Sequence, residues 1–247
     1  MRGPGALHWI RPDDAPDAFP DPRRALHEPD GLLAVGGDLA PVRLLAAYRR
    51  GIFPWYEAGQ PILWWSPDPR AILVPDELRI STSLRKTLRA GHLRVTLDAA
   101  FADVVSGCAA PRAHQRGTWL TTEMQHAYVR LHEMGYAHSV EVWSGDVLAG
   151  GLYGIALGRV FFGESMFSRV RDASKVALVR LVDEARARGF ELIDCQVQSR
   201  HLESLGSRTM SRQEFLRLLE RLCDDAHPGS WSAASGAHRS TGLPAED

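Results

Sequence analysis

The chain has 247 residues, of which 45% are hydrophobic and 24% charged, the proportions of an ordinary globular protein with a sizeable core. Lysine and arginine number 29 and aspartate and glutamate 30, so net charge argues neither for nor against a nucleic acid partner. Three scattered cysteines without CxxC spacing exclude a disulfide framework. The N-terminus has no apolar core of signal-peptide length, and no run approaches the roughly 20 apolar residues of a membrane span, which predicts a cytoplasmic protein without membrane contact.

The first part of the chain is rich in loops and predicts a small N-terminal α/β domain. One helix is expected from Asp38, a good N-cap residue, to just before Gly51, a residue typical of helix ends. Residues 66–69 read Ser-Pro-Asp-Pro and break regular structure, so we place the domain boundary there, at 1–69. Aromatic residues cluster before this boundary and are more often core than ligand platform: Trp55, Tyr56, Trp64 and Trp65.

Residues 70–227 predict a larger domain of the α+β class. The order strand–strand–strand–helix–strand–helix after residue 138 indicates a mixed sheet flanked by helices. Residues 228–247 are rich in Gly, Ser and Ala and predict a flexible tail. The expected elements are strands at 71–74, 139–143, 147–157, 159–168 and 190–197, and helices at 81–90, 121–134, 174–188 and 211–226.

The run 192–197 predicts a buried strand with a carboxylate in its middle. Asp194 and Gln196 are two residues apart, so they point to the same face. A carboxylate inside an apolar strand is costly unless it is paired, hydrogen-bonded or used. A structural partner, such as a nearby arginine, explains a lone strand aspartate about as often as a functional site does. The strand alone therefore leaves both interpretations open.

A second acid, Glu164, interrupts the preceding strand pattern. Its structural alternative is an ion pair with Arg169 or Arg171. Two neighbouring strands that each carry an acid, with Gly163 available for a β-bulge, favour a cleft instead. Strict alternation places Phe161 and Glu164 on opposite faces, so a site that uses both requires this bulge.

Several common catalytic motifs are absent from the sequence. It contains no GxGxxG after a strand, no Walker-type loop and no HExxH, so no cofactor and no metal are expected. The Gly163-Glu164-Ser165 triplet lacks the second glycine of a nucleophile elbow. Because Ser165 also lies within a strand pattern, we do not expect a serine nucleophile.

A local excess of positive charge lies between residues 78 and 97, which include no acid. The excess indicates either a solvated helix face or a patch that binds phosphates. Aromatic side chains beside cations are what single-stranded RNA recognition uses, since planar side chains hold bases and cations hold phosphates. The cations are Arg79, Arg85, Lys86, Arg89 and Arg94.

Seven short segments occur in one order along the chain, at 28–39, 50–55, 63–70, 117–119, 138–143, 163–168 (GESMFS) and 193–197 (IDCQV). Any one of them alone is a weak signal. Together they resemble the leucyl/phenylalanyl-tRNA–protein transferase family, over residues 19–222 of this chain. The order of several motifs makes the resemblance specific.

The resemblance implies a GNAT-like acyltransferase domain behind the small N-terminal domain. It implies transfer of Leu, or less readily Phe, from aminoacyl-tRNA to the α-amine of proteins that begin with Arg or Lys, which creates an N-degron. Ordinary GNAT enzymes grip the pyrophosphate of coenzyme A with a glycine-rich loop after the third strand. Residues 169–174 occupy that place here without a glycine, which favours an RNA donor. A monomer is expected.

The same resemblance implies catalytic roles for three residues. Asp194 and Gln196 contact the incoming α-amine, with Asp194 either a general base or only an anchor. Glu164 lies near the amino group or the ribose of the donor. These roles leave open which group takes the proton.

Binding roles are implied in the same way. Leu152 and Phe161 help to line an apolar pocket for the Leu or Phe side chain, and Ser165 joins the substrate-binding residues. Trp55 and Trp119 contact the terminal adenosine. The expected contacts of the acceptor-stem phosphates are Arg79, Arg85, Lys86 and Arg89.

Two alternatives remain open at this level. The first is a small-molecule N-acyltransferase that uses an acyl-thioester and therefore binds coenzyme A. The second is a non-catalytic RNA-binding module whose acids are structural, which binds tRNA without transfer. Coenzyme A binding and a transfer assay separate them.

Overall fold

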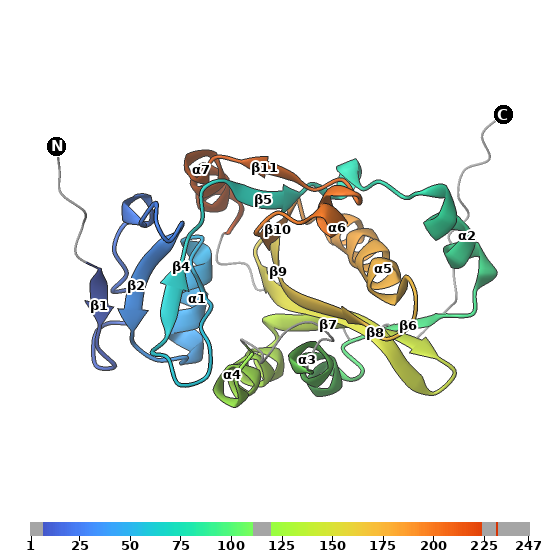
Figure 1. Cartoon of the computed structure of the whole chain (residues 1–247), viewed down its shortest axis with the longest axis horizontal. Helices are drawn as coiled ribbons and strands as arrows, with labels where there is room; N and C mark the ends of the chain where they lie inside the picture. The colour runs from blue at the N-terminus through green and yellow to red at the C-terminus, as the bar shows by residue number, and fades with distance from the viewer. Residues whose placement is uncertain (1–6, 111–119, 224–230, 232–247) are drawn as a thin grey trace.

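The computed structural model describes residues 7–110, 120–223 and 231. Within these ranges the chain forms a four-stranded sheet on the left of Figure 1 and a seven-stranded sheet on the right. No described helix combines the length and the apolar character needed to cross a membrane.

The four-stranded sheet has the order β1-β2-β4-β3, with β1 parallel to β2 and the other pairs antiparallel. The helix α1 (Pro41–Arg49) packs beside it and ends before Gly51, as expected. Asp38 is not its N-cap: Ala40 takes that position because Pro41, which lacks an N–H, is suited to the first helical turn. Asp38 instead accepts a hydrogen bond from the Ala40 amide at 2.8 Å. The strands are β1 (His8–Ile10), β2 (Leu32–Gly36), β3 (Phe53–Pro54) and β4 (Leu63–Trp65).

The seven-stranded sheet has the order β11-β5-β10-β9-β8-β7-β6. Among the adjacent strands of this sheet, β9 and β10 are parallel and every other pair is antiparallel. This arrangement confirms the mixed sheet expected from the sequence. The strands are β5 (Arg70–Leu73), β6 (Arg94–Leu97), β7 (Ala137–Ser144), β8 (Val147–Leu157), β9 (Val160–Ser168), β10 (Leu192–Gln196) and β11 (Arg208–Met210).

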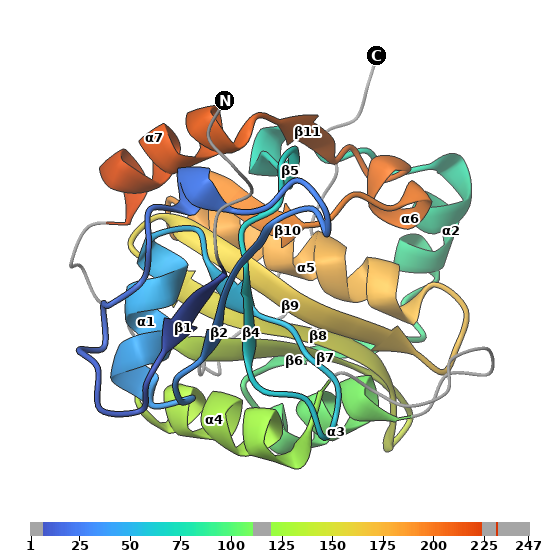
Figure 2. The same cartoon turned by 60° about the vertical axis from the view of Figure 1, so that its left-hand side comes forward.

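Helices cover both faces of the seven-stranded sheet (Figures 1 and 2). Successive glycines on β8 show the two faces: a Cβ at Gly150 would lie 2.7 Å from Ala173 of α5, and one at Gly151 would lie 3.2 Å from Val104 of α3. The absence of side chains lets both helices approach the strand closely. The helices are α2 (Thr82–Ala90), α3 (Phe101–Ala109), α4 (Thr122–Glu133), α5 (Ala173–Ala187), α6 (Arg200–Glu203) and α7 (Arg212–Leu222), with 3₁₀ turns at Pro22–Arg24 and Pro75–Glu77.

Several short elements are not predicted from the sequence. The strands β1 and β3, of three and two residues, are too short to show a period and take their conformation from the strand they pair with. The helix α3 is also missed, since its valines and Gly107 have low helix propensity. The last helix is shorter than expected, because α7 ends at Leu222 rather than near residue 226.

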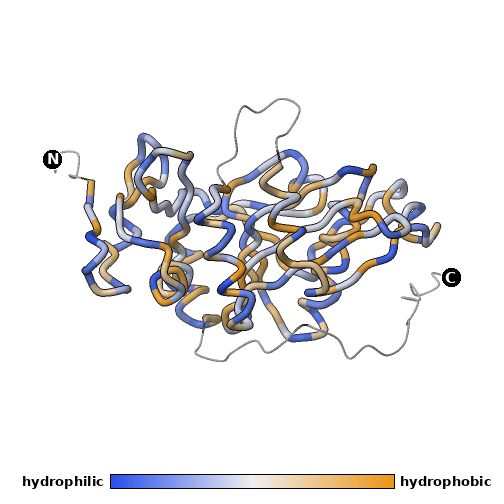
Figure 3. The backbone as a smooth tube through the Cα atoms, turned by 90° about the horizontal axis from the view of Figure 1, so that it is seen from below, coloured by the Kyte–Doolittle hydropathy of each residue, from blue (hydrophilic) through white to orange (hydrophobic). Residues whose placement is uncertain are grey.

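The hydrophobic core is continuous between the two sheets. One cluster of buried side chains includes Tyr48 of α1, Trp64 of β4, Tyr128 of α4 and Phe215 of α7. Hydrophobic stretches accordingly recur in both parts of the molecule (Figure 3). The two parts are therefore joined by packing as well as by the chain.

Trp231 lies within the segment expected to be a flexible tail, yet it is only 1% exposed. Its ring stacks on His138 with the centroids 4.6 Å apart. It also lies 5.4 Å from Phe161 and under the guanidinium of Arg188. The other residues from 224 to 247 lie outside the described part of the chain.

Candidate active site

A cavity of about 870 Å³ opens where β9 and β10 diverge. The two parallel strands pair only from Val160–Leu192 to Phe162–Asp194. Beyond that point both strands line the cavity, and helices α5 and α6 line its other side. Because the strands part without another strand between them, side chains from both edges face one space. The lining includes Leu152, Glu164, Ser165, Asp194, Gln196 and His201.

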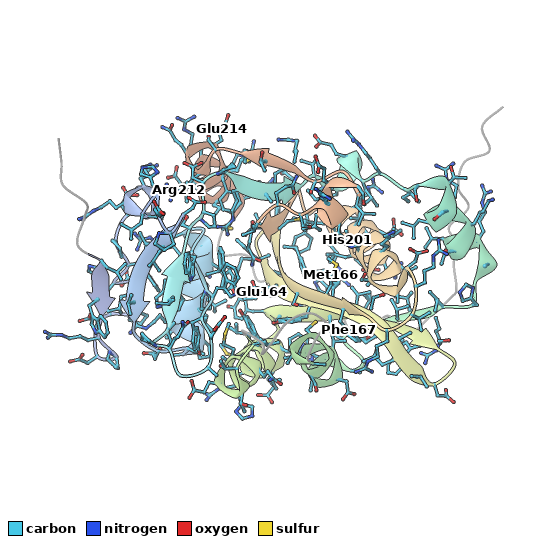
Figure 4. The ribbon with its side chains drawn as sticks, viewed as in Figure 1. Glu164, Met166, Phe167, His201, Arg212 and Glu214 are labelled. Carbon is cyan, nitrogen blue, oxygen red and sulfur yellow. The ribbon has the colours of Figure 1, made fainter. Side chains whose placement is uncertain are left out.

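A β-bulge places Glu164 at this cavity. Tyr153 pairs with Ser165 and Gly154 pairs with Gly163, so Glu164 is an extra residue on β9. This register shift confirms the bulge expected beside Gly163. Figure 4 shows Glu164 near the middle of the molecule, between the two sheets.

The Glu164 carboxylate is held from two sides. Its Oε2 accepts a hydrogen bond from the Tyr128 hydroxyl at 2.6 Å, and its Oε1 accepts one from the Gln196 amide at 2.8 Å. The side chain is only 9% exposed. Burial raises the pKa of Glu164 to about 7, although the hydrogen bond from Tyr128 opposes this rise. Glu164 therefore exchanges a proton near neutral pH.

Gln196 reaches Glu164 through an unusual backbone conformation. Its backbone φ angle of +59° lies in the left-handed region, which residues other than glycine rarely adopt. The pairing of β10 with β5 also shifts register between Asp194 and Gln196. The strand turns here, so the side chain of Gln196 points to Glu164 and not along the regular pleat.

Asp194 lies behind Gln196 in a buried ion pair with Arg70. The guanidinium donates from Nε to Oδ1 at 2.8 Å and from Nη2 to Oδ2 at 2.6 Å. The backbone amide of Gln196 donates to the same Oδ1 at 2.9 Å. The guanidinium also bonds the Gly51 carbonyl and lies between the rings of Phe53 and Phe215. Both oxygens of Asp194 are thus occupied by protein donors.

The sequence interpretation missed Arg70 and both tyrosines of the site. Arg70 ends the 63–70 motif and begins β5, but its partner lies 124 residues away. Tyr128 comes from α4, and Tyr48 of α1 lies with its hydroxyl 3.0 Å from that of Tyr128. The acidic strand residue was a signal that some cation pairs with it, but the sequence did not indicate which one.

Of the other residues expected to bind substrate, some line the cavity and others lie elsewhere. Leu152 and Ser165 line the cavity. Phe161 does not: it is fully buried on the side of the sheet that faces α5, against Trp231. Trp55 is 45% exposed, and its carbonyl accepts a hydrogen bond from the indole of Trp65. Trp119 lies outside the described residues.

The far end of the cavity carries different side chains. Met166 and Phe167 follow Glu164 along β9, and His201 lies across from them near α5 (Figure 4). Burial lowers the pKa of His201, and Lys175 adds to this effect, so the imidazole is neutral at physiological pH. In the described residues, no group of three His, Cys, Asp or Glu side chains is placed to hold a metal ion.

The basic residues expected to bind phosphates lie on and before α2, at the end of the molecule away from the four-stranded sheet (Figure 1). No ion pair within the described ranges involves any of them. They therefore present unneutralised charge to solvent. The exposed cations are Arg79, Arg85, Lys86 and Arg89.

A mixed sheet with helices on both faces, and an acid–amide pair where two parallel strands part, define an α+β protein with a largely apolar cavity that carries a few polar side chains. Comparison with known sequences gives its family. The sequence model of the leucyl/phenylalanyl-tRNA protein transferase matches residues 72–220, and the model of the N-terminal domain of that protein matches residues 37–68. The chain belongs to the leucyl/phenylalanyl-tRNA–protein transferase family.

Curated relatives agree over most of their length. The chain is 60% identical to a leucyl/phenylalanyl-tRNA–protein transferase of Stutzerimonas stutzeri, over 92% of this chain and 100% of the relative. It is 57% identical to one of Aromatoleum aromaticum, over 94% of this chain and 97% of the relative. Both relatives carry the name that the sequence resemblance indicated.

Solved structures give a weaker likeness. A GCN5-related N-acetyltransferase from Kribbella flavida shares 11% identity, with a TM-score of 0.39 over 67% of this chain and 59% of that one. The C-terminal domain of a putative lysylphosphatidylglycerol synthetase from Agrobacterium fabrum shares 14% identity, with a TM-score of 0.38 over 78% and 60%. At these scores neither likeness carries an argument about the site.

Proposed function

We propose that this protein transfers leucine, and less readily phenylalanine, from aminoacyl-tRNA to the N-terminal α-amine of acceptor proteins. The observation that carries this proposal is the 60% identity to a relative of that name over the whole length of the relative. In the reaction, the amine nitrogen bonds to the ester carbonyl carbon and the bond from that carbon to the ribose oxygen breaks. The amine loses a proton and the ribose oxygen gains one, so no cofactor is required.

Gln196 and Glu164 are the proposed contacts of the reacting groups, since both side chains line the cavity and bond each other. Asp194 is proposed as an anchor. Its oxygens already accept hydrogen bonds from Arg70 and from the Gln196 amide, which supports a role in holding Gln196 and not in taking a proton. Positioning of this kind contributes a large share of the rate in aminolysis.

The donor is proposed to lie with its side chain among the apolar residues of the cavity, which include Leu152, Leu178 and Ile193. Such a pocket selects by volume, so a change of one methylene alters transfer by about 1–3 kcal/mol. Trp55 and Trp119 are proposed to contact the terminal adenosine. The exposed cations of α2, together with Arg79, are proposed to contact the acceptor stem.

The acceptors are proposed to be proteins that begin with Arg or Lys, and the product to carry an N-degron. We further propose a cytoplasmic monomer, in which residues 1–69 and 70–227 form two domains. The end of the four-stranded sheet at Trp65 and the start of β5 at Arg70 support this division.

The test is transfer of labelled leucine from Leu-tRNA to a peptide that begins with Arg. The matched controls are the same peptide with an acetylated N-terminus and a peptide that begins with Ala. The proposal expects label only on the free Arg peptide. Calorimetric binding of coenzyme A would favour the small-molecule acyltransferase, and tRNA binding without label transfer would favour the RNA-binding module.

A further inference from the structure

Two tyrosine hydroxyls lie in a row behind Glu164. The Tyr128 hydroxyl is 2.6 Å from Oε2 of Glu164 and 3.0 Å from the hydroxyl of Tyr48. Tyr128 belongs to α4 and Tyr48 to α1, so both parts of the fold contribute to the row. Both side chains are at most 1% exposed, which excludes bulk water from these bonds.

The donors of these bonds follow from the number of protons. While Glu164 is ionised, Tyr128 donates its one hydroxyl proton to the carboxylate, so in that state the hydroxyl of Tyr48 donates to the oxygen of Tyr128. Hydrogen bonding from Tyr48 also lowers the pKa of Glu164. Burial raises the pKa of both phenols well above the ordinary value, so both keep their protons at neutral pH. With the amide of Gln196, the row directs donors at the carboxylate from two sides.

The other groups facing Glu164 do not neutralise it. Asp194 lies nearby with its charge paired to Arg70, and the repulsion between the two carboxylates helps to raise the pKa of Glu164. The buried hydroxyl of Tyr153 has no hydrogen-bond partner in the described part of the chain. Among the described residues, the ionised form of Glu164 therefore depends on hydrogen-bond donors, and these favour the charged form against burial.

The pKa of Glu164, about 7, lies close to the pKa of the acceptor's α-amino group. A free α-amino group has a pKa of roughly 7.7–8.0. Proton transfer between the two is then nearly balanced, whereas an ordinary carboxylate is a far weaker base.

We propose that Tyr48 and Tyr128 are positioning residues that keep Glu164 ionised, so that it accepts the proton which the acceptor's amine loses during attack on the ester. This inference rests on the proposed function. As the nitrogen–carbon bond forms and the carbon–oxygen bond to the ribose breaks, the proton passes from the amine to Glu164 and then to the ribose oxygen. The carboxylate is regenerated, and no further reactant is needed.

The test is Tyr128→Phe, which removes one hydroxyl and keeps the ring. The first measurement is the titration of Glu164 in the free protein, by NMR of ¹³C-labelled carboxyl groups. Loss of a hydrogen bond to a charged group should raise the pKa of Glu164 by about one unit or more. The second measurement is the pH profile of leucine transfer, whose acidic limb should also move to higher pH, by less than the titration because protonation of the acceptor's amine contributes to the same limb.

Two further variants make the test specific. Tyr48→Phe should raise the pKa of Glu164 and move the acidic limb of the pH profile in the same direction, each by a smaller amount than Tyr128→Phe. If Tyr128→Phe does not fold, the same two measurements on Tyr48→Phe test the proposal. Tyr153→Phe removes a buried hydroxyl that donates no bond to Glu164, so the limb should stay in place. An unchanged titration in Tyr128→Phe, or a loss of transfer that is equal at every pH, would overturn the role of the tyrosines. Wild-type protein that transfers no leucine would overturn the proposed function instead, while the titration stays measurable.

Discussion

Arg70 and Asp194 form a two-point ion pair across 124 residues of sequence, with neither side chain more than 1% exposed. The pair joins β5 to β10 directly behind the cavity. Through the bond from the Gln196 amide to Asp194, it also fixes the point where β10 turns. The pair thus holds the backbone at Gln196 through Asp194, and we expect its removal to affect stability and transfer separately.

Asp194→Ala and Arg70→Ala should each lower the free energy of unfolding by about 3–5 kcal/mol, because each leaves a buried charge without its partner. The double variant Arg70→Met/Asp194→Leu should be more stable than either single variant, since it buries no charge. Transfer should stay low in all three. Chemical unfolding measures the first effect, and full transfer in the double variant would show that the pair has no part in positioning Gln196.

Gln196→Gly should keep or raise stability and should lose transfer. A glycine relieves about 1 kcal/mol of backbone strain at a φ of +59° and removes the amide that bonds Glu164. Gln196→Ala is the control for Gln196→Gly, because it removes the same side-chain amide but does not relieve the backbone strain. A drop in the melting temperature of Gln196→Gly below that of Gln196→Ala would contradict the strain argument.

Glu164→Gln should stabilise the protein at neutral pH. The pKa of Glu164 is 4.5 as a reference and about 7 when folded, so the folded state binds more protons than the unfolded state between these values. The free energy of unfolding therefore falls as pH rises through this window, by about 3 kcal/mol in all. Glu164→Gln does not lose this free energy of unfolding, because Gln does not titrate. Its gain in stability over the wild type should therefore be absent below pH 4.5 and complete above pH 7. Denaturant unfolding at several pH values measures it, and a constant difference would contradict it.

Arg85→Ala/Arg89→Ala should weaken tRNA binding and reduce its salt dependence. Each phosphate contact that is lost should lower the slope of log affinity against log salt by about one. Arg217→Ala on α7 is the control, since it removes an equally exposed charge at another face. If the double variant and the wild type show the same slope of log affinity against log salt, the α2 cations do not contact phosphates.

Trp231→Ala should lower the free energy of unfolding by about 3–5 kcal/mol, the usual cost of removing a buried Trp side chain. Trp231→Phe should cost less, because it keeps an aromatic ring against His138 and Phe161. Thermal unfolding compares the variants. Wild-type stability in Trp231→Ala would show that the ring adds nothing to the core.

The local pattern of the sequence was enough for the longer elements. The strands β7 to β9, the helix α5 and the strand β10 follow from apolar alternation and helical spacing, both of which depend on neighbouring residues. The bulge beside Gly163 and the polar strand at Asp194 were likewise visible. Short strands such as β1 were not, because pairing with a distant strand determines them.

The sequence by itself determined the family, through seven motifs in one order, and the two acids that mark the site. Only the tertiary structure decided which partners each acid meets. Asp194 meets Arg70, which neutralises it, whereas Glu164 meets hydroxyls and an amide that leave its charge unpaired. Both carboxylates look alike along the chain, because burial and partners arise only when distant segments pack together.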